Sequence, residues 1–158
     1  MSADTARRDR SHPDGDWNHR FAEVNGLRLH HVREGGGPPI FLLHGWPEFW
    51  WTWHRNIPAL ETSFDVIAPD LRGFGDSHVE VGTDGPFPGL DSHAADILGL
   101  ADALGIGRFG IVSHDVGAYV TQHIARSHPE RLTGLFFLNA PYPGIGRRWV
   151  DAGQVREI

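Results

Sequence analysis

The sequence predicts an α/β fold with a mostly parallel sheet and an N-terminal antiparallel hairpin. Four short apolar runs are continuous rather than alternating, which is typical of strands covered on both faces. These runs are Ile40–Leu43, Val66–Ala68, Phe109–Val112 and Leu135–Leu138. Helical patterns lie between the runs, so the alternating order favours a layered parallel sheet with right-handed crossovers. Ligands of such folds bind beyond the carboxyl ends of the strands, and the residues that follow each run are therefore the candidates for function.

The hairpin is predicted over Phe21–Val32. Two alternating segments, Phe21–Val24 and Leu27–Val32, flank the dipeptide Asn25-Gly26. Asn-Gly between alternating segments is the strongest short signal for a two-residue hairpin turn. Glycines and prolines at positions 35–39 then end the hairpin and separate it from the first parallel strand.

A helix is predicted after Asp91, because the apolar residues there fall on one helical face. The residues on this face are Ala94, Ile97, Leu98, Ala101 and Leu104. We expect Asp91 or Ser92 to cap the start of the helix and Gly105 to end it. The preceding residues 78–90 are rich in glycine and proline and read as a loop.

Two further helical segments are predicted. Apolar residues recur at helical spacing after Asp115 until Pro129 ends the pattern. Those residues are Val116, Val120 and Ile124. The stretch Phe49–Leu60 is also periodic, and we expect Pro58 to kink or split it.

Composition excludes several classes of function. The chain has 158 residues and a net charge of −6, which does not favour nucleic acid or an anionic membrane as a partner. It has no cysteine, so it has neither a thiol nucleophile nor a cysteine metal site. No apolar stretch approaches the ~20 residues of a membrane span, and we expect a cytoplasmic protein. We expect the polar residues 1–18 to form a disordered tail and residues 19–145 to form the core.

The third parallel run ends in a pattern that indicates a nucleophile elbow. This elbow is a sharp turn from strand to helix, and it requires small residues two positions before and two positions after the nucleophile. Around Asp115 these positions are Ser113 and Gly117, and both are small. Around Ser113 they are Ile111 and Asp115, and neither fits. The pattern therefore selects Asp115 as the nucleophile.

An aspartate nucleophile implies displacement at carbon and an alkyl-ester intermediate, whereas a serine would form an acyl enzyme. The alternative is that Asp115 only caps the helix that begins at Val116, since aspartate is a good N-cap residue. The small flanking residues and the buried strand before Asp115 favour the nucleophile.

The first parallel run ends in His44-Gly45-Trp46-Pro47. An elbow enzyme needs two backbone N–H groups that stabilise the charge developing on the carbonyl oxygen. In this architecture one N–H follows the nucleophile and the other comes from the loop after this strand. These donors would be Val116 and Trp46. Gly45 permits a close approach, and the bond before Pro47 can be cis and fix a tight turn.

The second run ends in the segment Asp70–Ser77, which contains two glycines. We interpret it as a structural turn braced by Asp70 and Arg72, with little catalytic weight.

In these three segments the sequence resembles the epoxide hydrolases of the α/β-hydrolase fold, over roughly residues 18–150. The resemblance rests on His44–Pro47, the turn Asp70–Ser77 and Ser113–Gly117. The turn Pro141–Gly144 fits the point where the family inserts its helical cap, so residues 146–158 would begin that cap. The resemblance implies that Asp115 opens a small apolar epoxide, that a histidine oriented by an acid hydrolyses the ester to a vicinal diol, and that no cofactor or metal takes part.

Val116 departs from many related sequences, which place tryptophan directly after the nucleophile. Haloalkane dehalogenases use that tryptophan to hold the halide, and fluoroacetate dehalogenases commonly have arginine there. A haloalkane or haloacetate dehalogenase on the same scaffold is therefore the second reading. A classical esterase would need Ser113 as its nucleophile, which the elbow pattern disfavours.

The family order of nucleophile, cap, acid and histidine places the remaining catalytic groups after residue 158. We expect the fold to be truncated before the cap and the last strands, and the fragment to be inactive alone. A non-catalytic remnant is the third reading. We assign no base to His114, which should face the other side of the strand, or to His123 and His128. The strand Leu135–Leu138 would then be an open apolar edge and an aggregation site.

Overall fold

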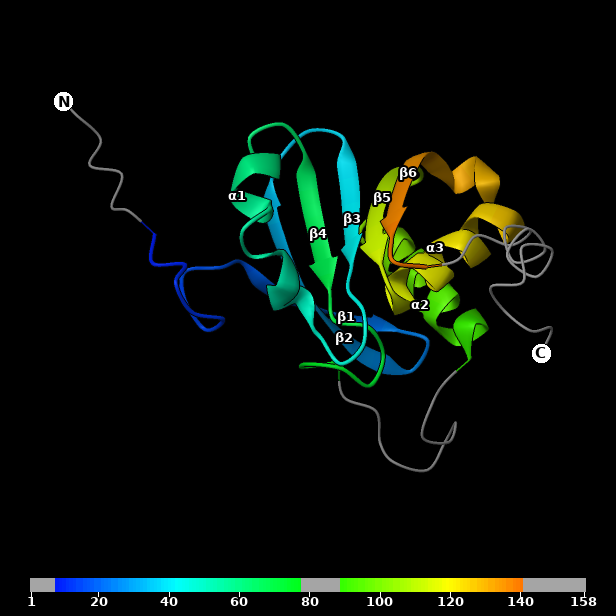
Figure 1. Cartoon of the computed structure of the whole chain (residues 1–158), viewed down its shortest axis with the longest axis horizontal. Helices are drawn as coiled ribbons and strands as arrows, with labels where there is room; N and C mark the ends of the chain where they lie inside the picture. The colour runs from blue at the N-terminus through cyan, green and yellow to red at the C-terminus, as the bar shows by residue number, and fades with distance from the viewer. Residues whose placement is uncertain (1–7, 78–88, 141–158) are drawn as a thin grey trace, which may run out of the picture.

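The computed structural model describes residues 8–77 and 89–140, and a six-stranded sheet lies at the centre of this part (Figure 1). The strand order is β1-β2-β4-β3-β5-β6. The strands are β1 (His19–Val24), β2 (Leu27–Gly35), β3 (Pro39–Leu43), β4 (Asp65–Pro69), β5 (Phe109–His114) and β6 (Leu132–Leu138). Strands β3 to β6 pair in parallel, whereas β2 pairs antiparallel with both β1 and β4. This confirms the predicted parallel sheet with an N-terminal hairpin.

The hairpin turn has the predicted chemistry. Asn25 and Gly26 have φ angles of 51° and 74°, and Val24 pairs directly with Leu27. Two successive residues with positive φ match the twist of the flanking strands, and asparagine and glycine tolerate this conformation best.

Both faces of the sheet are covered, as the continuous apolar runs predict. Phe41 and Leu43 on β3 belong to a core that includes residues of α2 (Leu90–Ala103) and α3 (Val116–Ser127). Leu42 between them points the other way, into a core with tryptophans of η1 (Trp50–Trp53) and with α1 (Ile57–Leu60). Figure 1 shows α1 on one side of β3 and β4 and the helices α2 and α3 on the other.

The expected split of Phe49–Leu60 is confirmed. The segment forms the short 3₁₀ helix η1 and then α1, with Pro58 in the first turn of α1. Proline is tolerated there because the N–H groups of a first helical turn have no partner within the helix.

The predicted cap of α2 is wrong, although its end is right. The helix begins at Leu90 after the N-cap residue Gly89, and no side chain caps it. Asp91 therefore lies in the first turn, where its negative charge interacts favourably with the positive end of the helix dipole. The helix ends at Ala103, followed by Leu104 and the predicted terminator Gly105.

Residues 8–18 differ from the expected disordered tail, because they pack against the sheet. The guanidinium groups of Arg8 and Arg10 lie 2.9 Å and 2.8 Å from the Glu34 carboxylate. The Asn18 backbone and side chain donate to the same carboxylate. Trp17 is 6% exposed and contacts the ring edges of the η1 tryptophans. Residues 8–18 are therefore fixed to the core by ion pairs and by Trp17, although their composition is polar.

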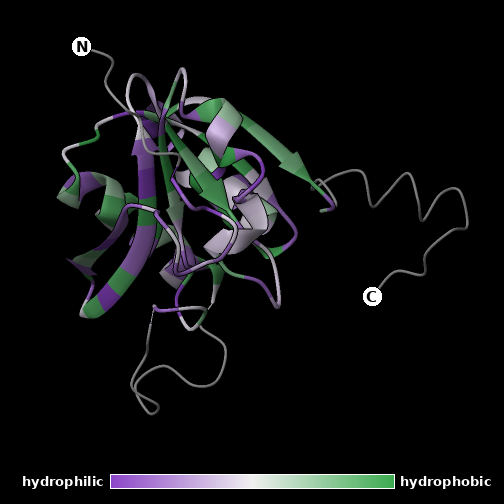
Figure 2. Ribbon diagram, turned by 90° about the vertical axis from the view of Figure 1, so that its left-hand side faces the viewer, coloured by the Kyte–Doolittle hydropathy of each residue, from purple (hydrophilic) through white to green (hydrophobic). Residues whose placement is uncertain are grey.

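Strand β6 is the last strand of the sheet within the described residues, as the sequence predicts for an open edge. Leu135, Phe136 and Leu138 expose 44%, 58% and 44% of their surface. Figure 2 shows an apolar strand leading into the C-terminal trace. Aggregation at this edge remains a prediction.

No helix among residues 8–77 and 89–140 is long and apolar enough to cross a membrane. The turn at positions 141–144, the segment 146–158 and most of the loop 78–90 lie outside the described residues.

Candidate active site

Asp115 occupies the turn between β5 and α3 in a strained backbone conformation. Its φ and ψ angles are 51° and −122°, although it carries a side chain. A positive φ at a residue other than glycine costs on the order of 1–3 kcal/mol and persists where the surrounding structure enforces it. Although Asp115 is the N-cap residue of α3, its side chain makes no capping hydrogen bond. The cap alternative therefore does not explain this carboxylate.

The two small residues around Asp115 have separate structural reasons. A Cβ atom on Gly117 would lie 2.5 Å from the Leu43 carbonyl oxygen and 2.7 Å from that of His44. The Gly117 N–H donates to the His44 carbonyl at 3.1 Å, so the helix starts against the end of β3. No other residue fits this approach without displacing the backbone.

Ser113 lies near the end of β5, two residues before Asp115, and is fully buried. Its hydroxyl is 2.7 Å from that of Thr121, which itself donates to the Gly117 carbonyl at 2.9 Å. Because the single Thr121 proton is used in that bond, the Ser113 hydroxyl donates to Thr121. Ser113 therefore braces the start of α3. Its burial disfavours the esterase reading, in which this hydroxyl would attack substrate.

The Asp115 carboxylate receives backbone donors from the two predicted positions. The Trp46 N–H donates to Asp115 Oδ1 at 3.0 Å. This bond lowers the pKa of Asp115, burial opposes the shift, and the Val116 N–H and the nearby His114 lower the pKa further. The carboxylate is therefore ionised at neutral pH, the form that a nucleophile requires.

The loop 44–50 carries the Trp46 N–H to this position. The Trp46–Pro47 peptide bond is cis. A Cβ atom on Gly45 would lie 2.6 Å from Asp115 Cβ, so glycine is needed where the loop passes the carboxylate. The loop closes on itself, because the Glu48 N–H donates to the Gly45 carbonyl at 3.0 Å.

His44 fixes the start of the loop from a fully buried position. Its Nε2 accepts from the Leu71 N–H at 2.9 Å, so this nitrogen carries no proton. Its Nδ1 lies 2.8 Å from the Gly45 carbonyl and must donate to it. Burial lowers the pKa of His44, which keeps the ring neutral in this tautomer.

His114 and Glu48 form a pair beside Asp115 that the sequence alone does not predict. His114 Nε2 lies 2.7 Å from Glu48 Oε2, and the ring packs edge-on against Trp53. Trp53 belongs to the core on the η1 face, so His114 faces that side of the strand. The same Glu48 oxygen accepts from the Gly45 N–H at 3.2 Å. Glu48 thus ties the loop to the end of β5.

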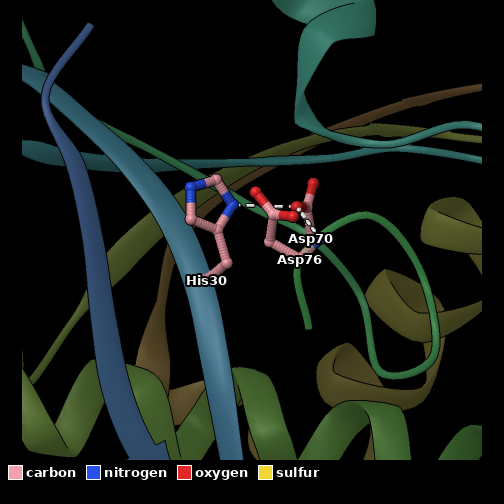
Figure 3. A group of neighbouring side chains, drawn as sticks. All are labelled: His30, Asp70 and Asp76. Carbon is pink, nitrogen blue, oxygen red and sulfur yellow. Dashed lines mark hydrogen bonds and ion pairs between the residues drawn. The ribbon is translucent and has the colours of Figure 1, made fainter. Parts of the chain in front are cut away.

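The segment Asp70–Ser77 is braced as predicted. Arg72 makes two hydrogen bonds of 2.7 Å with Asp96 on α2. Figure 3 shows the side chains of Asp70, His30 and Asp76 gathered together. One possible metal-ligand atom from each lies within 4.8 Å of the others. Both His30 nitrogens and both Asp70 oxygens already have protein partners, so this group forms an internal network.

The fold and this elbow define the class of the protein. A family model described as the alpha/beta hydrolase fold matches residues 38–154, and the chain belongs to this family.

Its relatives include several epoxide hydrolases. The chain is 41% identical over 129 residues to the soluble epoxide hydrolase of Corynebacterium sp. (strain C12), covering 80% of this chain and 43% of the relative. It is 34% identical over 128 residues to mouse epoxide hydrolase 4, and the match covers 80% of this chain and 35% of the relative. Among solved structures, an epoxide hydrolase from Vigna radiata matches with a TM-score of 0.71 and 35% identity. The match covers 80% of this chain and 39% of that structure's chain. The chain thus spans less than half the length of each.

Proposed function

We propose that Asp115 is the nucleophile of an epoxide-hydrolase-type reaction. The hydrogen bond from the Trp46 N–H to Asp115 Oδ1 carries this proposal. It leaves the second carboxylate oxygen as the one that attacks an epoxide carbon. The C–O bond of the ring breaks, its electron pair stays on the ring oxygen, and that oxygen takes a proton from solvent water. The product of this step is a hydroxyalkyl ester of Asp115.

The backbone donors support the second half of the reaction. In the ester, Oδ1 is the carbonyl oxygen, and water attack on its carbon places negative charge there. The Trp46 N–H, which already donates to Oδ1, would stabilise that charge together with the Val116 N–H. Removing one such donor commonly lowers the rate by about 10²–10³-fold. Ester hydrolysis also needs a base, and the His114 ring faces the η1 side of β5, where it packs against Trp53. We therefore propose that these residues form the ester and that its hydrolysis depends on groups outside residues 8–77 and 89–140.

A single-turnover experiment tests the proposal. The chain is incubated with an aryl epoxide, and its intact mass is followed with time. We expect one equivalent of epoxide to add and to remain bound. Asp115→Asn should abolish the addition, whereas Asp91→Asn, which changes a carboxylate that is 90% exposed, should leave it unchanged. Equal addition to both variants would show adventitious alkylation and refute the proposal.

The dehalogenase alternative predicts a different reactivity. A dehalogenase would form an Asp115 ester from haloalkanes or haloacetates and release halide. Because Val116 offers no N–H side chain or charge to hold a halide, we expect addition from the epoxide and no halide above the Asp115→Asn background. Faster reaction with the halides would favour the alternative.

A further inference from the structure

Asp70 lies just after β4 and is 1% exposed. Its Oδ1 accepts from the Trp50 N–H at 2.7 Å. Its Oδ2 lies 2.8 Å from His30 Nδ1 and accepts from the Asp76 N–H at 2.9 Å. Figure 3 shows the His30 ring pointing at this carboxylate from β2. The two backbone N–H groups donate to this carboxyl group, one to each oxygen, and His30 Nδ1 donates as well when Asp70 is ionised.

Asp70 and its neighbour Leu71 hold both ends of the loop 44–50. Asp70 binds the N–H of Trp50 at the end of the loop. The Leu71 N–H donates to the ring of His44 at its start. The Trp46 N–H that reaches Asp115 lies between these two anchors. The position of that donor therefore depends on the segment after β4.

His30 continues the network to the surface through His19. His30 Nε2 lies 2.9 Å from His19 Nδ1, and His19 Nε2 lies 3.0 Å from the Pro13 carbonyl. The two ring planes are 26° apart. His30 is fully buried, whereas His19 on β1 is exposed, so the pair can exchange protons with solvent through His19.

The partners at the two ends fix the number of protons in this pair. The carboxylate of Asp70 and the carbonyl of Pro13 only accept, so His30 Nδ1 and His19 Nε2 each carry a proton. The central nitrogen–nitrogen contact needs a third proton between the rings. Two neutral imidazoles hold two protons in total. With Asp70 as a carboxylate, all three contacts are made together only when the pair carries one proton, and one positive charge, more than two neutral rings.

Other charged groups face this pair from the elements around it. The Asp76 carboxylate lies within the same 4.8 Å cluster. The Arg28 guanidinium stacks on Phe21, whose ring contacts His30. His31 follows His30 on β2 and is buried, and His44 is close enough to Asp70 to interact with it electrostatically. The exchangeable proton nevertheless lies in the contact between His19 and His30.

We propose that Asp70 is a positioning residue for the Trp46 N–H donor and that the shared proton of His19 and His30 sets its placement. This inference rests on the proposed function of Asp115. When the shared proton leaves, one of the three contacts in the chain must break, and the Asp70 carboxylate loses its compensating charge. The Trp50 anchor then shifts, and with it the loop that presents Trp46.

Nuclear magnetic resonance on the ¹⁵N-labelled chain tests this directly. The ring nitrogens of His19 and His30 report the number of protons, and the Trp46 amide reports its hydrogen bond to Asp115. We expect three protonated ring nitrogens at low pH. As pH rises, loss of one proton and movement of the Trp46 amide should follow a single transition. Two protonated nitrogens at every pH, or a Trp46 amide that ignores the transition, would overturn the inference.

Matched variants separate this relay from general effects of histidine. In His19→Phe the Trp46 transition should change its position, because the second ring that shares the proton is gone. His30→Gln should make the Trp46 amide insensitive to this transition. His128→Gln, an exposed histidine, should leave it in place. A Trp46 transition unchanged in His19→Phe and His30→Gln would contradict the proposal. If a variant does not fold, the titration of the original chain still decides.

The rate of ester formation provides the readout at Asp115. In the original chain this rate should follow the same transition as the Trp46 amide, and His30→Gln should lower it about tenfold at saturating epoxide, since small misplacements are costly. If no ester forms in any protein, the proposed function has failed, while the resonance experiment still decides the positioning role. If ester forms at a rate independent of the relay, the positioning role is wrong.

Discussion

The N–H of Trp46 and the Oδ1 of Asp115 are joined by a hydrogen bond of 3.0 Å, although 69 residues separate them in the chain. The bond connects the loop after β3 to the turn after β5, which are adjacent parallel strands. It lowers the pKa of the carboxylate and leaves one carboxylate oxygen free of this donor. The predictions below follow from the residues that hold this contact in place.

Gly117→Ala should destabilise the chain and slow ester formation. The new methyl group would meet the carbonyl oxygens of Leu43 and His44 at less than van der Waals distance. Overpacking of this kind typically costs about 1–3 kcal/mol. Urea unfolding measures the cost, and Gly107→Ala is the matched control because nothing lies within 4 Å of its added Cβ. Equal stability of the two variants would contradict the close approach.

Ser113→Ala should still form the Asp115 ester. The change removes the hydrogen bond to Thr121 and should cost about 1 kcal/mol of stability. An esterase that used Ser113 would lose its reaction entirely. The measurement is the rate of mass addition from the epoxide. A complete loss of addition in a folded variant would return Ser113 to consideration as the nucleophile.

The stability of the chain should fall as pH decreases from about 6.5 to about 4. Burial lowers the pKa of His31 from 6.5 to about 4. Between these pH values the His31 ring is protonated in the unfolded chain and neutral in the folded chain. Its contribution to the free energy of unfolding is therefore complete above pH 6.5 and is lost progressively as the pH falls toward 4. It amounts to at most about 3 kcal/mol.

Urea unfolding at several pH values measures this dependence. His31→Leu should flatten the curve in that interval, while His128→Gln, an exposed histidine, should not. The buried rings of His44 and His93 also have lowered pKa values and should leave a smaller slope of the same sign. A His31→Leu curve identical to that of the original chain would show that His31 is not protonated on unfolding.

Trp17→Ala should destabilise the chain by about 3 kcal/mol, the usual cost of removing a large buried aromatic side chain. Trp17 is 6% exposed and packs on Trp50 and Trp51. Asn18→Ala in the same segment should cost less, since it removes one side-chain hydrogen bond to Glu34. A neutral Trp17→Ala variant would restore the interpretation of residues 8–18 as a loose tail.

The sequence was sufficient where the physical reason is local. The Asn25-Gly26 turn, the helix end at Gly105 and the small residues around Asp115 are each visible within a few positions. The selection of Asp115 over Ser113 agrees with the buried hydroxyl of Ser113 and the strained backbone of Asp115.

The remaining features depend on partners distant in the chain. Arg10 binds Glu34 and Glu61, so the composition of residues 8–18 alone could not reveal that they are anchored. Asp70 reaches the loop through the Trp50 N–H, a contact set by the packing of η1 against β4. Glu48 directly follows the motif His44–Pro47. This position was the one signal in the sequence that could have suggested its contacts with Gly45 and His114.

The most direct test of the central claim is peptide mass spectrometry of the chain after a single exposure to an aryl epoxide. We predict one added equivalent on the peptide that contains Asp115, with fragmentation placing it on that aspartate as an ester that hydroxylamine removes. A modification on another residue, or a stable adduct that remains in Asp115→Asn, would contradict the assignment of Asp115 as the nucleophile.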